Sequence, residues 1–186
     1  EGRARRSARH GEGRSKTSSG VTYEGHWEHG ERHGQGRWRH PAGDWYDGAW
    51  ACGVRQGEGR ALLPGDMEWR GSWSDDAPSG QGAMRYANGD AYEGEAKGGL
   101  RSGEGVLRYA GGDEYRGAFC LDVRHGAGEL RDAAGALLYA GAWENDARAG
   151  QGEGLTSSAD HWRGRWAGGE PSGEGSLTYA ADGGGS

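Results

Sequence analysis

The most constraining feature of this chain is an aromatic and glycine signal that returns every 23 or 24 residues. It first occurs as Tyr23, Gly25 and Trp27, where an aromatic residue, a glycine and a second aromatic residue alternate along the chain. The opening aromatic residue then recurs at Tyr46, Trp69, Tyr92, Tyr115, Tyr139 and Trp162. A fixed period of this length is typical of stacked supersecondary units, in which each unit packs on its neighbours in the chain.

Glycines give the repeat a common frame. If the opening aromatic residue is repeat position 1, glycine occupies positions 3, 12 and 14 of every unit, as in Gly25, Gly34 and Gly36. Units start near residues 1, 23, 46, 69, 92, 115, 139 and 162, and the first and last are incomplete. These three positions hold 24 of the 41 glycines. We therefore expect residues 1–186 to form one repeat array.

The spacing within a unit favours a β-hairpin. A glycine costs about 1 kcal/mol in a helix interior, and a βαβ unit needs about 30 residues. Positions 1, 3 and 5 fall on one face of a first strand, and positions 12, 14, 16 and 18 on one face of a second. Polar positions 7 to 11 are expected to join them, and signals such as Asn88-Gly89-Asp90 mark turns between units. The sequence predicts an all-β protein, an elongated single-layer antiparallel sheet of about eight stacked β-hairpins.

The recurring glycines have a steric explanation. We expect rings from positions 1 and 5 to lie over the glycines of positions 12 and 14 in an adjacent strand. Tyrosine and tryptophan suit this arrangement because each has a large apolar body and one polar atom that needs a partner. The chain has nine tryptophans and eight tyrosines but only one phenylalanine, Phe119 at position 5. Ala96 replaces the position-5 ring in one unit, and packing is expected to be weaker there.

Charge and cysteine usage limit the classes of partner. The net charge is −6, yet residues 1–40 carry a balance of +4 and residues 41–186 a balance of −10. An acidic sheet is a poor surface for nucleic acid, whereas the basic first part could contact an acidic partner or anionic headgroups. Cys52 and Cys120 lie three units apart and are expected to be unpaired, which favours a reducing compartment. We see no signal peptide and no apolar run of about 20 residues.

No catalytic, cofactor-binding or metal-binding residue is predicted, and the chain is not expected to be an enzyme. The glycine pairs lack the following helix and the Gly-Lys-Ser/Thr signature of a phosphate loop. His26, His29, His33 and His40 fall in one unit, so zinc binding is conceivable. The repeat explains them more simply, because His10 and His125 recur at the repeat position of His33. Carboxylates likewise recur at position 13, which indicates a solvated ladder.

The segment Tyr23-Glu-Gly-His-Trp-Glu-His-Gly-Glu-Arg-His-Gly-Gln-Gly36 resembles the MORN repeat (membrane occupation and recognition nexus), and the resemblance covers essentially the whole chain. It implies a curved single-layer sheet of hairpins. MORN arrays occur in cytoskeletal and axonemal proteins, in junction-forming membrane proteins, and beside lipid kinase or lysine methyltransferase domains. Some bind a helix or peptide, and some dimerise. Asp76, Asp122 and Asp146 replace a position-8 glycine, so those hairpin tips are expected to differ.

The leading hypothesis is a non-catalytic scaffold for protein–protein interaction in a cytoplasmic, cytoskeleton-associated assembly of the ciliary, flagellar or axonemal kind. A helix or extended segment of a partner would lie on the aromatic face, because buried aromatic residues carry much of the energy of interfaces. The candidate partner-binding residues are Trp27, Trp50, Trp73, Tyr92, Tyr115, Trp143 and Trp166. The same rings could instead only hold the sheet together. Edge strands at either end could also pair with another chain.

Three alternatives remain open at this point. The first is a peripheral membrane module that binds anionic phospholipids, which would need a basic face or apolar loop tips. Most expected tips are acidic or small, as in Ser74-Asp75-Asp76, and only the first unit suits anionic lipid. The second is a regulatory module of a larger enzyme. The third is a choline- or glycan-binding hairpin array, which the Gly-x-Gly spacing fits less well.

Overall fold

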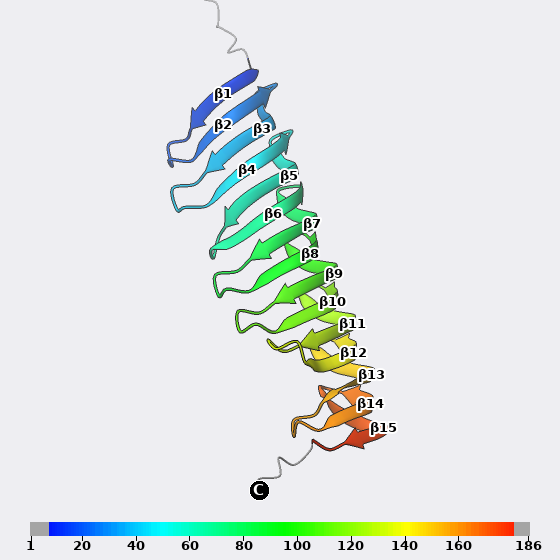
Figure 1. Cartoon of the computed structure of the whole chain (residues 1–186). Helices are drawn as coiled ribbons and strands as arrows, with labels where there is room; N and C mark the ends of the chain where they lie inside the picture. The colour runs from blue at the N-terminus through cyan, green and yellow to red at the C-terminus, as the bar shows by residue number, and fades with distance from the viewer. Residues whose placement is uncertain (1–7, 181–186) are drawn as a thin grey trace, which may run out of the picture. The chain divides into compact units, whose positions relative to one another are not determined.

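Every regular element of the protein is a β-strand in residues 8–180, the part of the chain that the computed structural model describes. The strands follow chain order in one antiparallel sheet (Figure 1). They are β1 (Gly11–Lys16), β2 (Thr22–Glu28), β3 (Glu31–Arg39), β4 (Trp45–Ala51), β5 (Val54–Leu63), β6 (Met67–Ser74), β7 (Ala77–Arg85), β8 (Ala91–Lys97), β9 (Leu100–Arg108), β10 (Glu114–Cys120), β11 (Val123–Arg131), β12 (Leu137–Glu144), β13 (Ala147–Leu155), β14 (His161–Ala167) and β15 (Glu170–Thr178). The predicted all-β sheet of hairpins is confirmed.

The chain divides into two compact units, each of which contains several repeats; from here on, "first unit" and "second unit" mean these two parts of the chain. The first contains residues up to Ala87 together with Ala96–Gly99, and the second contains Asn88–Glu95 together with residues from Leu100 onward. Strands β1 to β7 belong to the first unit, β9 to β15 belong to the second, and β8 is divided between them. Strand β1 is the second strand of the incomplete first repeat, whose opening positions lie outside the described residues.

Each hairpin of the described chain turns through repeat positions 7 and 8. His29 and Gly30, between β2 and β3, have φ angles of 50° and 89°. Positive φ at both central residues is the mark of a type I′ turn, whose twist matches that of the flanking strands. The connection is therefore two residues long, and the predicted loop over positions 7 to 11 is wrong.

A bulge in the second strand of each hairpin absorbs the residues that the short turn leaves over. In the β2–β3 hairpin, Gly25 pairs with Gly36 and Trp27 pairs with Arg32, so one residue on β2 faces three on β3. Gly34 lies in this bulge with a φ of 60°. Position 12 therefore needs glycine because the backbone there is left-handed.

The glycines at positions 3 and 14 form a row across neighbouring strands. The position-1 ring of each hairpin packs on this row. Positions 3 and 14 pair with each other, so that Gly36 faces Gly25 on one side and Gly48 on the other. A Cβ atom on Gly36 would lie 2.3 Å from the Tyr23 hydroxyl oxygen. The predicted cover of position 14 is confirmed. At position 12 the prediction is wrong, since a Cβ on Gly34 would instead meet the His26 side chain, at 3.3 Å.

Candidate functional site

The position-1 ring is held by a hydrogen bond inside its own strand. The Tyr23 hydroxyl donates to the carbonyl of His26 at 2.9 Å, and Trp69 Nε1 donates to the carbonyl of Ser72 at 3.2 Å. The equivalent bonds run from Tyr46, Tyr92, Tyr115, Tyr139 and Trp162. Each position-1 residue is thus a tyrosine or a tryptophan whose ring carries the donor of this bond.

Position-5 rings fill the spaces between position-1 rings. Trp50 makes edge-to-face contacts with Tyr23 and Tyr46, at centroid distances of 5.4 Å and 5.1 Å. Phe119 lies in the same way between Tyr92 and Tyr115 in the second unit. Edge-to-face pairs of this kind add about 0.5–1.5 kcal/mol beyond their buried area. The rings of each unit therefore form a continuous packed layer.

Arginine side chains pack over the rings of this layer. Repeat position 10 is arginine in six of the eight repeats, and its side chain lies over the position-5 ring of the following repeat. Arg32 lies 4.1 Å from the Trp50 ring centroid, and Arg124 lies 4.2 Å from that of Trp143. The same arrangement is made by Arg9, Arg55, Arg101 and Arg148. We call this row the arginine ladder; its cation–π contacts cover rings that would otherwise face solvent.

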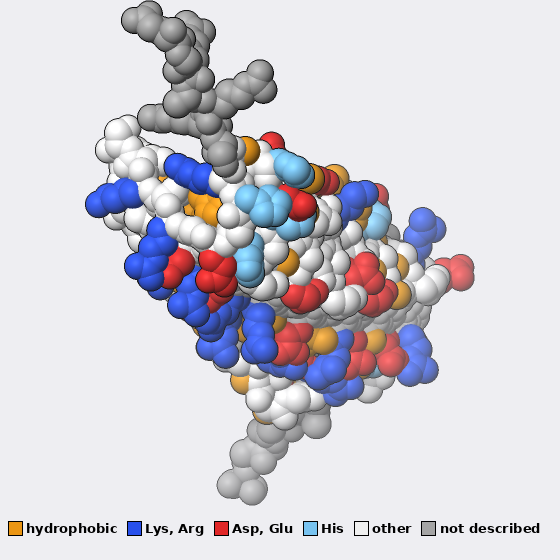
Figure 2. Space-filling model, turned by 90° about the horizontal axis from the view of Figure 1, so that it is seen from above, with side chains coloured by type: hydrophobic (Ala, Val, Ile, Leu, Met, Phe, Trp, Pro, Cys, Tyr) orange, Lys and Arg blue, Asp and Glu red, His pale blue; other side chains and the backbone are white. Residues whose placement is uncertain are grey.

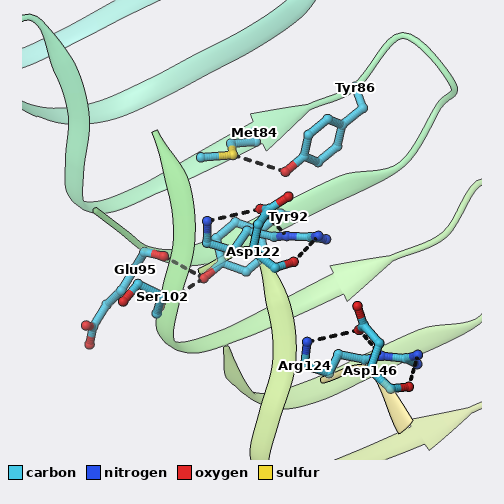
Figure 3. A network of polar contacts seen from close by, with 9 residues as sticks. Met84, Tyr86, Tyr92, Glu95, Ser102, Asp122, Arg124 and Asp146 are labelled. Carbon is cyan, nitrogen blue, oxygen red and sulfur yellow. Dashed lines mark hydrogen bonds and ion pairs between the residues drawn. The ribbon is translucent and has the colours of Figure 1, made fainter. Parts of the chain in front are cut away.

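An aspartate at position 8 anchors three of these arginines, and Figure 3 shows the pair of Arg124 and Asp146. The Asp146 carboxylate accepts bonds from the backbone N–H and the Nε of Arg124, at 3.0 Å and 2.8 Å. Arg124 in turn donates to the Asp146 carbonyl at 2.9 Å. Asp76 and Asp122 bind Arg55 and Arg101 in the same way. The tips with aspartate keep the positive-φ turn of the glycine tips and differ from them in these side-chain bonds.

The predicted partner-binding residues all lie in the ring layer. Trp50, Trp73, Trp143 and Trp166 are at most 4% exposed, and Tyr92 and Tyr115 are fully buried. Trp27 is half-buried, and Arg9 lies 4.6 Å from its ring centroid. That these rings anchor a partner stays a prediction. A partner that approaches this face would contact the arginine ladder first. The recurrence of arginine at repeat position 10 is the sequence pattern that could have predicted this ladder.

Burial of the ring layer changes the ionisation of its polar groups. Loss of hydration raises the pKa of the Tyr46 and Tyr115 hydroxyls well above their usual range. Burial lowers the pKa of the guanidinium groups of Arg32 and Arg148. Both directions follow from the cost of a charge in a partly dehydrated site.

The opposite face of the sheet, which we call the outer face, carries the charged positions 2, 4, 13, 15 and 17. Arg14 pairs with Glu24 at 2.6 Å, while Arg37 and Arg60 share Asp47 at 3.1 Å and 3.2 Å. Figure 2 shows Lys and Arg side chains interleaved with Asp and Glu side chains on the surface. Exposed pairs of this kind contribute little to stability, so these side chains are available for recognition.

A basic groove runs along the outer face of the first unit. Two adjoining hollows of about 520 Å³ and 300 Å³ form it. We define the basic groove by the side chains along its walls, which are Arg14, Lys16, Thr22, Glu24, Arg37, Arg39, Trp45, Asp47 and Arg60. Five of these are cations and two are carboxylates, so the groove is positive although the chain is acidic.

The histidines near the hairpin tips contact one another and an acidic neighbour. His10 and His29 pack edge to face at 5.8 Å, and His33 lies 3.3 Å from the Glu28 carboxylate. No group of three or more histidine, cysteine, aspartate or glutamate side chains is placed to hold a metal ion within residues 8–180.

The described part of the chain contains no helix long and apolar enough to cross a membrane.

Comparison with known proteins agrees with the repeat geometry. The MORN repeat family model matches residues 23–45, 46–64, 69–91, 92–114, 139–153 and 162–183. The chain belongs to the MORN repeat family. The β10–β11 hairpin lies between matched segments and has the same ring, glycine and arginine contacts. A search of curated proteins found no match.

Family membership defines the class of function at a coarse level. MORN repeats are generally non-catalytic modules that serve as repeat scaffolds or bind membranes, through contacts with proteins or lipids.

Proposed function

We propose that the chain is a non-catalytic scaffold that binds other proteins, and that it works in a cytoskeletal assembly of the ciliary or axonemal kind. The observation that supports this best is that the residues of the buried face are nearly constant between repeats, whereas those of the outer face vary. Positions 1, 3, 10 and 14 repeat almost unchanged and build the buried layer. The outer-face positions vary from hairpin to hairpin in both charge and size, as expected of a surface that recognises partners.

The proposal can be tested in ciliated cells that express the tagged chain. We expect the chain to remain on axonemes after detergent extraction and to form cross-links to axonemal proteins there. Two results together would contradict the cytoskeletal assignment. They are complete release of the chain by detergent, and its recovery in the membrane fraction when cells are fractionated without detergent.

A peripheral membrane function is the second candidate, and the basic groove is the observation that favours it. Membrane binding by a sheet protein also needs apolar groups that enter the headgroup region. Among the hairpin tips of the described chain, Leu121 is the apolar residue, with 75% of its surface exposed. It lies in the second unit, whereas the groove lies in the first. Flotation with phosphatidylserine vesicles at physiological salt tests this candidate, and the scaffold proposal expects the chain to stay in the soluble fraction.

A further inference from the structure

At repeat position 17, the cations of the basic groove differ from those of the second unit. Position 17 is Lys16 and Arg39 in the groove, and Arg108 and Arg131 in the second unit. Arg108 is neutralised by two carboxylates, Glu114 at 2.9 Å and Glu93 at 3.3 Å, and Arg131 pairs with Glu129. Within residues 8–180, no carboxylate lies at ion-pair distance from Lys16 or Arg39, nor from Arg85, which holds the same position in β7 outside the groove. The first unit therefore keeps charge at a position where the second unit cancels it.

Trp45 adds a ring that the repeat does not require. It precedes position 1, and the residues at this place in the other units are Thr22, Glu68, Ala91, Glu114, Leu138 and His161. None of these is phenylalanine, tyrosine or tryptophan, so the hairpin forms without a large aromatic ring at this place. Trp45 is half-buried on the groove wall, with the Arg60 guanidinium 5.8 Å from its ring centroid. Half-exposed tryptophan beside arginine is a common composition for the centre of a protein interface.

The spacing of the groove cations fits an extended chain. Lys16 and Arg39 are one hairpin apart, which corresponds to two strand spacings of about 4.8 Å, or about 9.6 Å. A peptide in the extended polyproline II conformation advances about 3.1 Å per residue with three residues per turn. Every third side chain therefore lies on one side of it, about 9.3 Å from the next, and can face successive hairpins. Arg14, Arg37 and Arg60 repeat with the same spacing along the other wall.

We propose that the basic groove binds an extended acidic segment of a partner protein, with carboxylates at every third residue facing the cations of successive hairpins. This inference rests on the proposed scaffold function and names the surface and the partner chemistry for it. Charge complementarity carries it, because the groove holds unneutralised cations in an otherwise acidic chain. The Trp45 ring would take an apolar side chain of the same segment.

The test uses a labelled peptide of about 12 residues with aspartate at every third position, and the matched peptide with asparagine. Fluorescence anisotropy is measured at an ionic strength of about 0.15 M, where distant charges are screened. We expect the aspartate peptide to bind more tightly than the asparagine peptide. The double variant Lys16→Gln, Arg39→Gln should weaken its binding by about tenfold, which corresponds to about 1.4 kcal/mol.

The matched control is the double variant Arg108→Gln, Arg131→Gln, which removes the same charge at the same repeat position. It should change binding by less than about twofold, because its cations are already neutralised. Lys16 and Arg39 make no ion pair within the described chain, so their variant should keep the wild-type melting temperature. Equal losses in the two double variants, or equal binding of the two peptides, would overturn the proposal.

Two further outcomes separate this inference from the scaffold function. If an axonemal partner cross-links equally well to the Lys16→Gln, Arg39→Gln chain, the scaffold function stands and the groove proposal fails. If the groove variant loses binding to phosphatidylserine vesicles while the aspartate peptide binds neither chain, the occupant is a membrane surface and the groove proposal fails as well.

Discussion

The hydroxyl of the position-1 tyrosine makes a hydrogen bond within its own strand while its ring covers two glycines. Tyr115 shows both contacts, since it donates to the Ala118 carbonyl at 3.0 Å and lies against Gly117 and Gly128. The ring and the glycines are therefore one steric unit. Removal of the donor and addition of a methyl group test the two halves of this unit separately.

Replacement of Tyr115 by phenylalanine should lower the free energy of unfolding by about 1–2 kcal/mol, because the part-buried Ala118 carbonyl loses its donor. Urea denaturation measures the effect. Tyr115→Trp is the matched control, since Trp69 and Trp162 make the equivalent bond through Nε1. Tryptophan should cost less than phenylalanine, and the reverse order would show that the bond is unimportant.

Addition of a methyl group in Gly128→Ala should cost about 3 kcal/mol, the upper part of the range for overpacked cores. The new Cβ would lie 2.2 Å from the Tyr115 hydroxyl oxygen and 2.5 Å from two ring carbons. Gly111→Ala is the control, because a Cβ there meets nothing within 4 Å. If thermal unfolding showed equal losses for the two variants, the steric role of position 14 would be refuted.

At the scale of one hairpin, the turn is stabilised in two chemically different ways. Position 8 has a positive φ in every described hairpin, with glycine in some and aspartate in others. Asp146 adopts a φ of 66° at a steric cost and offsets it through the bonds to Arg124. The aspartate also fixes the arginine that covers Trp143, so the turn and the ring layer are coupled.

The substitution Asp146→Ala should lower the free energy of unfolding by about 1–2 kcal/mol, because it keeps the left-handed strain and loses the hydrogen bonds. Asp146→Gly should cost less, since glycine relieves the strain. A double-mutant cycle with Arg124→Met measures the coupling by urea denaturation. Additive losses in that cycle would mean that the aspartate and the arginine act independently.

At the scale of the whole chain, stability is shared among hairpins that contact their neighbours in sequence. Many of the polar atoms in the buried layers of both units are tyrosine hydroxyls, and burial raises their pKa. A group with a raised pKa in the folded state contributes its full stability below its unfolded pKa. That contribution is lost as the pH rises above about 10, the ordinary tyrosine value, because the unfolded chain ionises first.

We therefore expect the melting temperature to hold steady from pH 8 to about pH 9.5 and to fall steadily above pH 10. Thermal melts with parallel phenolate absorbance measure this. The chain has two lysines, Lys16 and Lys97, so few other groups ionise in that range. A melting temperature that stays constant to pH 11 would contradict the burial of the hydroxyls.

The hairpin and its frame could be read from the spacing of a few residues, because local geometry alone dictates them. Gly25, Gly36 and their counterparts exclude a helix and place the rings on one face. The arrangement of the turn was harder to predict. The I′ turn at His29 and Gly30 and the bulge at Gly34 compensate for each other, and only the cross-strand register reveals both.

The sequence by itself determined the repeat, the strand content and the family, since each depends on residues close together in one unit. The tertiary structure decided which of those residues remain accessible. The rings are covered by arginines from the preceding repeat, about 18 residues earlier in the chain, as Arg32 covers Trp50. Likewise Arg108 is neutralised and Arg39 is not, because ion pairing depends on the side chains that neighbouring strands bring alongside.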